Sequence, residues 1–386
     1  MPQNNWLIRN SQIVTPLRTI SDGFVKVENG RIAAIGQGEA RAPNGFEVYN
    51  AEGRLLSPGL IDLHVHGGGG ADTLDGTSEA LHTIALANAH MGTTSILPTL
   101  ISASERRMME ALGTIARTAE GPRKGAVILG AHLEGPFINA QKRGVHPAEY
   151  IQDPSVEIFH QFLKAAGKWL KILTLAPEMP QALEVVKGSI AAGVIPSAGH
   201  TAATYLQMMA GFDAGICYAA HAFNAMSGFE SREPGAVGAL LASPQIWTEV
   251  IADGLHVHPA SVDIFLRAHG TERALLVTDA VRPTGTNMKA FKMGDIEAEV
   301  RNGGSFTKQG RLCGSILTMN VAVKNLTRWT KLPIQEILRM GTSNPARALG
   351  LEETKGSIGV GKDADLVVFD ENFKPTLVLV EGNRAL

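Results

Sequence analysis

The chain has 386 residues, 44% of them hydrophobic, which is enough apolar material for one large α/β barrel and a smaller appended unit. Lysines and arginines number 35 against 37 aspartates and glutamates, so the formal net charge is −2 and no basic footprint for a nucleic-acid partner stands out. The two cysteines, Cys217 and Cys313, make no disulfide framework, and neither a signal peptide nor an apolar run of about 18 residues is visible. We therefore expect a soluble protein of the cytoplasm.

Both ends of the chain are predicted to form short β-strands. Apolar runs at the N-terminus are separated by turn signals such as Asn29-Gly30. The C-terminus returns to the same pattern in residues 364–370 and 376–382. Because the middle of the chain lacks this pattern, we expect a small β-sandwich domain assembled from residues 1–56 and 357–386.

The middle of the chain, residues 57–356, alternates short apolar runs with amphipathic helical stretches. Eight runs are predicted as strands: 59–66, 95–99, 127–134, 171–176, 194–200, 217–223, 249–256 and 274–279. The stretches between them, such as 78–91 and 260–269, have helical spacing. This order predicts an α/β fold, a TIM-like (β/α)8 barrel of parallel strands buried on both faces.

His64 and His66 close the first predicted barrel strand and are followed by four glycines, 67–70. Residues at i and i+2 of a strand share a face, so both imidazoles point the same way, and the glycines let other groups approach. This arrangement would suit a metal ion at the mouth of a barrel. The alternative is a strand that happens to carry two polar residues.

Other predicted strands also end in polar residues, at the end of the barrel where such folds carry their chemistry. The groups at these strand ends are His64, His66, His132, Glu134, His200, His221, Asn224, Asp253, His256 and Asp279. Each one alone has a structural alternative, such as a histidine bonded to a backbone carbonyl. Together they favour a metal centre, because buried unpaired charges are costly and an ion lets imidazoles and carboxylates converge. This donor set suits Zn²⁺ or a related divalent ion with one position open to water.

Within this set we assign Glu134, His200 and His221 as the metal ligands. Asp279 is suited to take a proton from water at the metal and to return it to a leaving amine, although it could instead orient a loop. The histidines without the same strand-end logic are interpreted as structural or exposed: His82, His90, His132, His160, His258 and His269. Cys217 is interpreted as a core residue.

Eight short motifs spread over most of the chain carry a family resemblance. They occupy residues 58–62, 132–137, 199–201, 221–226, 232–235, 251–256, 277–280 and 356–366. In these motifs the chain resembles the amidohydrolase superfamily and, within it, the N-acetylglucosamine-6-phosphate deacetylases and the related N-acetylgalactosamine-6-phosphate deacetylases. The resemblance implies metal-dependent hydrolysis of the N-acetyl group of an amino-sugar 6-phosphate, which releases acetate and the free amine.

The resemblance also implies roles for individual residues. Glu134, His200 and His221 would bind the metal, Asp279 would donate and accept the proton, and His146 would polarise the acetyl carbonyl. The implied substrate-binding positions are Val145, Asn224, Ala225, Arg232, His256, Leu312, Cys313 and Gly314.

Two implications concern assembly and metal number. In the family the arginine matching Arg232 reaches in from a neighbouring subunit, which implies a homodimer; without the resemblance, Arg232 would be interpreted as a surface ion-pair partner of Glu230 or Glu233. Some family members lack the His-x-His pair and use one metal, while others keep it and can hold two. With His64 and His66 present, a second ion sharing Glu134 as a bridge is feasible.

Two other functions compete with the deacetylase. A cyclic-amide hydrolase of the dihydroorotase or hydantoinase kind would keep the His-x-His pair and the final aspartate, but it would favour a bridging lysine and would not need Arg232. A non-catalytic relative would have no reason to retain His200, His221 and Asp279. The sequence leaves open the gluco or galacto epimer, the identity of the metal and the number of ions bound.

Overall fold

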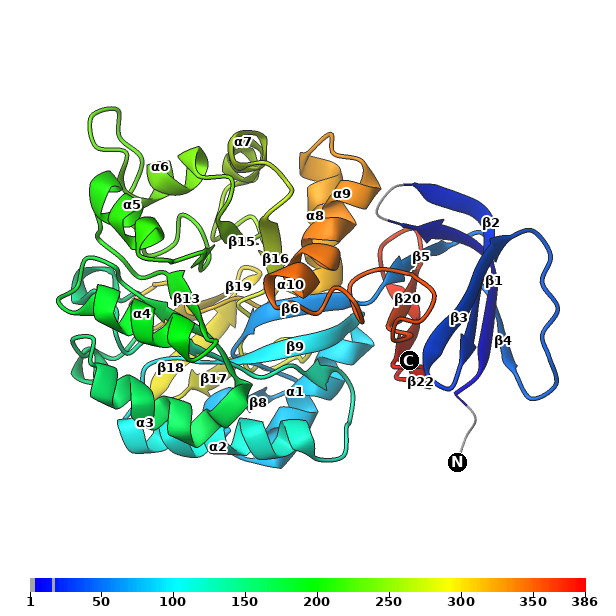
Figure 1. The fold of residues 1–386 in the computed structure, drawn as a ribbon, viewed down its shortest axis with the longest axis horizontal. Coiled ribbons are helices and arrows are strands. Elements are labelled where there is room, and N and C mark those ends of the chain that lie inside the picture. The colour runs from blue at the N-terminus through cyan, green and yellow to red at the C-terminus, as the bar shows by residue number, and fades with distance from the viewer. Residues whose placement is uncertain (1–3, 16–17) are drawn as a thin grey trace.

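The computed structural model describes residues 4–15 and 18–386. Figure 1 shows a barrel wrapped in helices and, at one side of it, a smaller β-sheet where both ends of the chain lie. The predicted α/β fold, with a TIM-like barrel and a small β unit built from both termini, is confirmed.

The small sheet is mixed and has eight strands, in the order β22-β21-β20-β5-β1-β2-β3 with β4 paired to β1. Its N-terminal strands are β1 (Trp6–Val14), β2 (Thr19–Glu28), β3 (Arg31–Gln37), β4 (Glu47–Asn50) and β5 (Leu55–Pro58). Its C-terminal strands are β20 (Leu366–Phe369), β21 (Pro375–Val380) and β22 (Asn383–Arg384). The two chain ends meet where β20 pairs antiparallel with β5, Leu366 opposite Pro58.

The barrel strands pair in parallel, as both-face burial predicts. They are β6 (Leu60–Val65), β9 (Thr93–Leu100), β11 (Ala131–Glu134), β12 (Leu170–Leu175), β13 (Ile195–Ala198), β14 (Tyr218–Ala219), β15 (Trp247–Ile251) and β16 (Ala274–Val277). The short strand β10 (Val127–Ile128) also pairs with β9, in addition to β6 and β11. A parallel bridge between Val65 and Ala280 brings the first strand against the last. Each of the eight predicted strand segments overlaps one of these strands.

The helices cover the outside of the barrel (Figure 1). They are α1 (Ser78–His90), α2 (Glu105–Glu120), α3 (Val156–Ala166), α4 (Ala182–Ala191), α5 (Tyr205–Asp213), α6 (Gly235–Ala242), α7 (Pro259–His269), α8 (Met319–Trp329), α9 (Ile334–Met340) and α10 (Ser343–Ala348). Short 3-10 turns lie at Thr73–Asp75, Ala140–Lys142, Ala148–Tyr150 and Gly167–Trp169. Several helices begin where the sequence offers a capping hydroxyl: Thr77, Ser104 and Ser155 each accept a hydrogen bond from a first-turn amide.

Two small antiparallel units, neither anticipated from the sequence, lie near the barrel mouth. The glycine run forms the hairpin β7 (Gly67–Gly68) and β8 (Ala71–Asp72), in which Gly69 and Gly70 have positive φ. A three-stranded sheet follows β16 and consists of β17 (Ala290–Met293), β18 (Ile296–Arg301) and β19 (Gly304–Thr307). The amide of Cys313 donates to the carbonyl of Ser305, which ties the segment after β19 back to this sheet.

The barrel and the small sheet have separate hydrophobic cores that share strand β20. Leu366 and Val368 lie in the core of the small sheet, whereas Val367 and Phe369 lie in the barrel core. Side chains alternate along a strand, so β20 buries one face in each unit and joins them.

Replacing Phe369 tests this junction. The side chain is 1% exposed, so we expect Phe369→Ala to lower the free energy of unfolding by about 3–5 kcal/mol, because it leaves a cavity in the barrel core. Urea unfolding followed by circular dichroism measures the change. Phe229→Ala is the matched control, because Phe229 is 62% exposed and should change stability by about 0.5 kcal/mol or less. Equal losses in the two variants would contradict the shared-strand junction.

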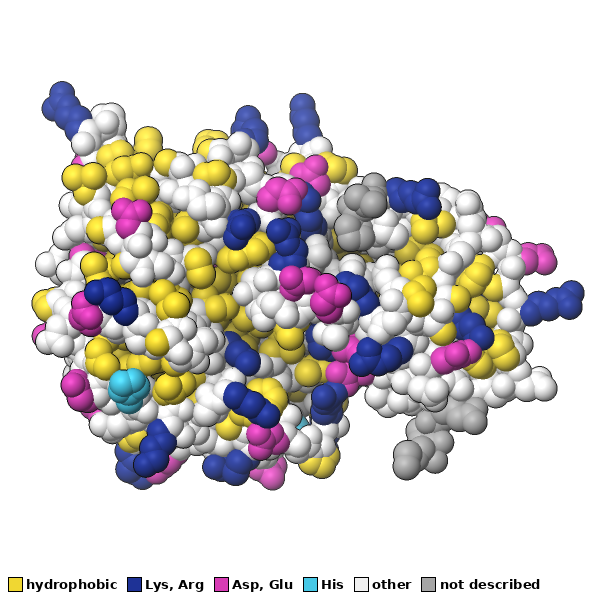
Figure 2. Space-filling model, viewed as in Figure 1, with side chains coloured by type: hydrophobic (Ala, Val, Ile, Leu, Met, Phe, Trp, Pro, Cys, Tyr) yellow, Lys and Arg dark blue, Asp and Glu magenta, His cyan; other side chains and the backbone are white. Residues whose placement is uncertain are grey.

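The surface agrees with the near-neutral charge. Acidic and basic side chains are interspersed over the face shown in Figure 2. Among the described residues, no helix combines the length and apolar character needed to cross a membrane.

The interpretation of Cys217 as a core residue is wrong. Cys217 lies exposed just before β14, because the burial of that short strand begins only at Tyr218.

Candidate metal centre

Three candidate residues lie two positions beyond the ends of their strands, where the backbone becomes left-handed. His200 follows β13 with φ 47°, His221 follows β14 with φ 29°, and Asp279 follows β16 with φ 52°. Such conformations are uncommon for residues other than glycine and often mark functional sites, because the surrounding structure must hold them. Their clustering at one end of the barrel indicates that this end is specialised.

Glu134, at the end of β11, lies at the centre of the cluster. Its Oε1 atom is 2.8 Å from Nε2 of His221 and 3.1 Å from Nε2 of His200, and those two nitrogens are 3.2 Å apart. All three side chains are buried. The three residues assigned as ligands from the sequence are therefore brought together.

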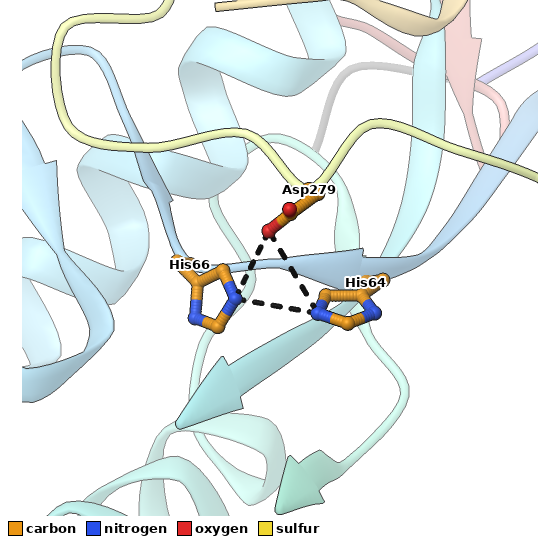
Figure 3. Close-up of side chains that lie close together, drawn as sticks. All are labelled: His64, His66 and Asp279. Carbon is orange, nitrogen blue, oxygen red and sulfur yellow. Dashed lines mark hydrogen bonds and ion pairs between the residues drawn. The ribbon is translucent and has the colours of Figure 1, made fainter. Parts of the chain in front are cut away.

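The His-x-His pair lies on the other side of Glu134. Figure 3 shows His64 and His66 on the strand with Asp279 approaching from a loop. The Nε2 atoms of the two histidines are 3.3 Å apart, and Oδ1 of Asp279 is 3.1 Å from His66 and 3.8 Å from His64. Glu134 also reaches this side, with Oε2 at 3.3 Å from His66 Nε2 and Oε1 at 3.5 Å from His64 Nε2. Its carboxylate thus lies between two groups of possible ligands.

In His64 and His200, the ring nitrogen that points away from Glu134 makes a hydrogen bond that fits metal binding by the other nitrogen. Nδ1 of His200 is 2.9 Å from the carbonyl oxygen of Lys142, and Nδ1 of His64 is 2.8 Å from Oε2 of Glu249. A nitrogen facing an acceptor carries the proton, so Nε2 of each ring keeps its lone pair for an ion. Four triplets of His, Glu and Asp atoms in this region lie within 4.8 Å of one another. The residues present therefore fit a metal site with nitrogen and carboxylate ligands.

The electrostatics of the cluster favour ionised carboxylates. Burial alone would raise the pKa of Glu134, but its close contacts with His64 and His200 hold it well below its usual range. Burial likewise opposes the ionisation of Asp279, yet its hydrogen bond to His66 lowers its pKa. Both carboxylates are thus anions that can bind a metal ion or accept a proton.

His146 differs from the ligand histidines in its hydrogen bonding. The backbone N–H of Ser102 donates to Nδ1 at 3.3 Å, and the Ser102 hydroxyl lies 2.8 Å from the same nitrogen. Nδ1 therefore accepts, which places the proton on Nε2, 3.5 Å from Oε2 of Glu134. Burial lowers the pKa of His146 to about 4, so the ring is neutral. It suits a hydrogen-bond donor at the site better than a metal ligand.

A pocket opens above the cluster at the mouth of the barrel. Its walls include the candidate metal residues other than His64 and, among the predicted substrate positions, Val145, Asn224, Ala225, His256, Leu312 and Gly314. His256 is held by Asp253, whose Oδ2 is 2.7 Å from Nδ1. Ile101, Gly144 and Met293 also line the pocket and were not anticipated.

Two predicted substrate residues lie elsewhere in this chain. Cys313 is fully buried beneath the pocket wall, and its thiol approaches the sulfur of Met293 at 3.7 Å. Arg232 is exposed on the loop before α6 and does not line the pocket. The structure therefore does not bring these two side chains to the pocket within a single chain.

Sequence reasoning missed three buried residues that contact the cluster. Ser102 bonds to His146, and Glu249 bonds to His64. Asp62 accepts from the His64 amide and from the Thr278 hydroxyl, and burial raises its pKa to about 7. The charged residues within the buried strands 60–65 and 247–251 were the sequence signal that could have revealed Asp62 and Glu249.

His132 is structural, as the sequence suggests: its ring nitrogens face Thr174 Oγ1 and the Leu63 carbonyl rather than Glu134.

A parallel barrel that gathers imidazoles and carboxylates at the carboxyl ends of its strands is the architecture of a metal-dependent hydrolase. The chain belongs to the amidohydrolase family, whose sequence model matches residues 55–385. Within that family it belongs with the N-acetylglucosamine-6-phosphate deacetylases, as its similarity to individual relatives shows.

The N-acetylglucosamine-6-phosphate deacetylase of Bacillus subtilis is 35% identical to the chain over 382 residues, which cover 98% of this chain and 96% of the relative. An N-acetylgalactosamine-6-phosphate deacetylase of Escherichia coli is 34% identical over 379 residues, covering 98% and 99%. The fold is similar to a solved structure of a Mycobacterium smegmatis N-acetyl-D-glucosamine-6-phosphate deacetylase variant in complex with N-acetyl-D-glucosamine-6-phosphate. That match has a TM-score of 0.93 and 29% identity and covers 99% of each chain.

Proposed function

We propose that the protein hydrolyses the N-acetyl group of N-acetyl-D-glucosamine 6-phosphate to D-glucosamine 6-phosphate and acetate, a step in amino-sugar catabolism. The observation that carries this proposal is the convergence of Glu134, His200 and His221 beside Asp279 at the base of one pocket. The names of the relatives support the same substrate. The cyclic-amide alternative is less well supported. Such a hydrolase would favour a lysine as the bridge between the two ligand groups, and this chain has Glu134 at that position.

Zn²⁺ is the ion we propose for the site. Glu134, His200 and His221 would hold it, and His64 and His66 would hold a second ion that shares Glu134. A divalent ion there would act as a Lewis acid that lowers the pKa of water toward about 7 and polarises a carbonyl.

The remaining chemistry belongs to the side chains. Asp279 accepts a proton from the attacking water as the water oxygen adds to the acetyl carbon. It then returns this proton to the amide nitrogen as the C–N bond breaks, so that acetate and the free amine leave. The N–H at Nε2 of His146 donates to the acetyl oxygen as negative charge develops there. Removing one such donor typically slows a reaction about 10²–10³-fold.

The sugar phosphate would be held by Arg232 and His256, with a donor from the Asn224-Ala225 backbone. A guanidinium can bind phosphate oxygens through two parallel hydrogen bonds. Because Arg232 lies outside the pocket of its own chain, we propose that it serves the neighbouring site of a homodimer. The two free cysteines and the absence of a membrane-spanning helix among the described residues fit a cytoplasmic enzyme.

Replacing Arg232 tests the phosphate role. We expect Arg232→Ala to raise KM for the phosphorylated substrate about 10–100-fold, because a charged hydrogen-bonded contact contributes roughly 1.5–3 kcal/mol, with less effect on kcat. Steady-state kinetics measure both constants. Arg267→Ala is the control, because Arg267 is an exposed arginine on α7 that does not line the pocket. An unchanged KM in Arg232→Ala would contradict the assignment.

A substrate panel tests the function itself. The purified protein is given N-acetylglucosamine 6-phosphate, its galacto epimer, unphosphorylated N-acetylglucosamine and dihydroorotate, and acetate release or ring opening is followed. We expect the highest kcat/KM on the gluco phosphate and a large loss without the phosphate. A higher kcat/KM on the galacto epimer would show that the proposed substrate is wrong. Ring opening of dihydroorotate without deacetylation would show that the proposed reaction is wrong.

A further inference from the structure

Glu249 is a carboxylate in the middle of β15, a strand whose five residues are all buried. The side chain is 0% exposed and lies beneath the metal centre rather than in the pocket. A charge in such a place is costly unless it is fully hydrogen-bonded, so its partners indicate why it is there.

Three donors surround the carboxylate. Oε2 lies 2.8 Å from Nδ1 of His64 and accepts from the backbone N–H of His221 at 3.0 Å. Oε1 accepts from the hydroxyl of Tyr218 at 2.8 Å. Glu249 thus has an N–H or O–H partner at each carboxylate oxygen. It therefore contacts one residue from each side of Glu134.

The contact with His64 decides which ring nitrogen carries the proton. A carboxylate facing Nδ1 keeps the proton on Nδ1, which leaves the lone pair on Nε2. That Nε2 atom lies 3.3 Å from His66 Nε2, near Glu134 and Asp279. His66 is different, because its Nδ1 has no hydrogen-bond partner among the described residues.

His132 provides an internal comparison in the same layer of the barrel. It is as buried as His64, and the two rings are 4.6 Å apart. Its Nε2 is 2.7 Å from Thr174 Oγ1 and its Nδ1 is 3.2 Å from the Leu63 carbonyl, so both nitrogens are engaged below the site. His64 therefore directs its Nε2 atom at the candidate metal centre, whereas both ring nitrogens of His132 are taken up by hydrogen bonds elsewhere.

We propose that Glu249, supported by Tyr218, is the positioning residue that enables the His64–His66 side of the centre to hold a second ion. It orients the His64 ring, fixes its tautomer and makes its Nε2 a better ligand. The proposal rests on the proposed function only in assuming the metal centre. It predicts that Glu249 controls the number of ions bound, while the ion at Glu134, His200 and His221 does not depend on its charge.

The test is a zinc titration of Glu249→Gln. Glutamine can keep its oxygen toward His64 and the His221 amide while removing the charge, so the fold is retained. Zn²⁺ binding is measured by competition with a chromogenic chelator and by elemental analysis of the dialysed protein. We expect the second ion to bind 10–100-fold more weakly and the first to bind as in the wild type. Tyr218→Phe, which removes only one donor to the carboxylate, should shift the second ion in the same direction by less.

Two controls separate positioning from general destabilisation. Thr174→Val removes an equally buried hydrogen bond in the same layer, to His132, and should leave both zinc affinities unchanged. In a His64→Asn background, Glu249→Gln should have no further effect on zinc binding, because the residue through which it acts is gone.

Three results would overturn the proposal: wild-type zinc affinities in Glu249→Gln, a first ion weakened as much as the second, or a wild-type chain that never holds more than one ion. Failure of the proposed function is distinguishable from these. A wild-type chain that binds two ions but releases no acetate would refute the deacetylase and leave the role of Glu249 standing.

Discussion

Asp279→Asn is expected to lower kcat for acetate release by roughly 10²–10⁴-fold, the range typical for the loss of a general acid–base group. The amide keeps the shape of the side chain, but it cannot accept a proton from water or deliver one to the leaving nitrogen. Oδ1 of Asp279 is 3.1 Å from Nε2 of His66, and Asp279 shares no candidate ligand triplet with His200 or His221. An ion held by Glu134, His200 and His221 should therefore remain bound. Steady-state kinetics with elemental analysis of the same sample measure both effects.

The matched control for this variant is Asp153→Asn, because Asp153 is exposed and lies outside the pocket. It should retain the wild-type rate and metal content. Turnover by Asp279→Asn close to that of the wild type would refute the proton-transfer role. Loss of all metal would instead assign Asp279 mainly to holding ions.

The second large effect is expected from Glu134→Gln. Glu134 contacts both ligand groups, so we expect the variant to lose bound metal from both and to lose acetate release with it. Metal binding should also stabilise the wild-type fold, by about 4 kcal/mol when free metal is 1,000 times its Kd. The wild type should therefore melt at a lower temperature after chelation, while Glu134→Gln should melt at the same temperature with or without chelator.

Glu149→Gln is the control, since Glu149 is exposed and away from the cluster. It should behave as the wild type in metal content and in the response to chelation. A Glu134→Gln variant that retains a full complement of metal would contradict the central position of this carboxylate.

The barrel could be predicted from the sequence because its strands are short apolar runs with helical stretches between them. The same pattern placed Glu134, His200 and His221 at strand ends, where the structure finds them in mutual contact. Parallel strands of a barrel end at one rim, so residues distant in sequence meet there.

The partners beneath the ligands could not be predicted in the same way. A glutamate within an apolar strand, such as Glu249, signals that something is paired, but the partner His64 is 185 residues away and depends on the closed barrel. The tautomer of His146 likewise depends on Ser102, which comes from a different loop. The sheet at 290–307 was missed because its strands are short and lie in an insertion between β16 and α8.

Two of the implied substrate residues, Arg232 and Cys313, do not line the pocket of their own chain. Arg232 is exposed in this chain, and the role proposed for it would require a neighbouring subunit. Cys313 lies in the turn with Leu312 and Gly314, which line the pocket, yet its own side chain is buried behind them. A motif can place a segment at a site without telling which of its side chains faces the substrate.

The decisive experiment follows acetate release from N-acetylglucosamine 6-phosphate in one preparation of the protein, before metal removal, after metal removal and after Zn²⁺ is restored. We expect one free amine per acetate, loss of activity when the metal is removed and recovery of activity with Zn²⁺. Acetate release that persists at the full rate in metal-free protein, or no release by a protein with full metal content, would contradict this expectation.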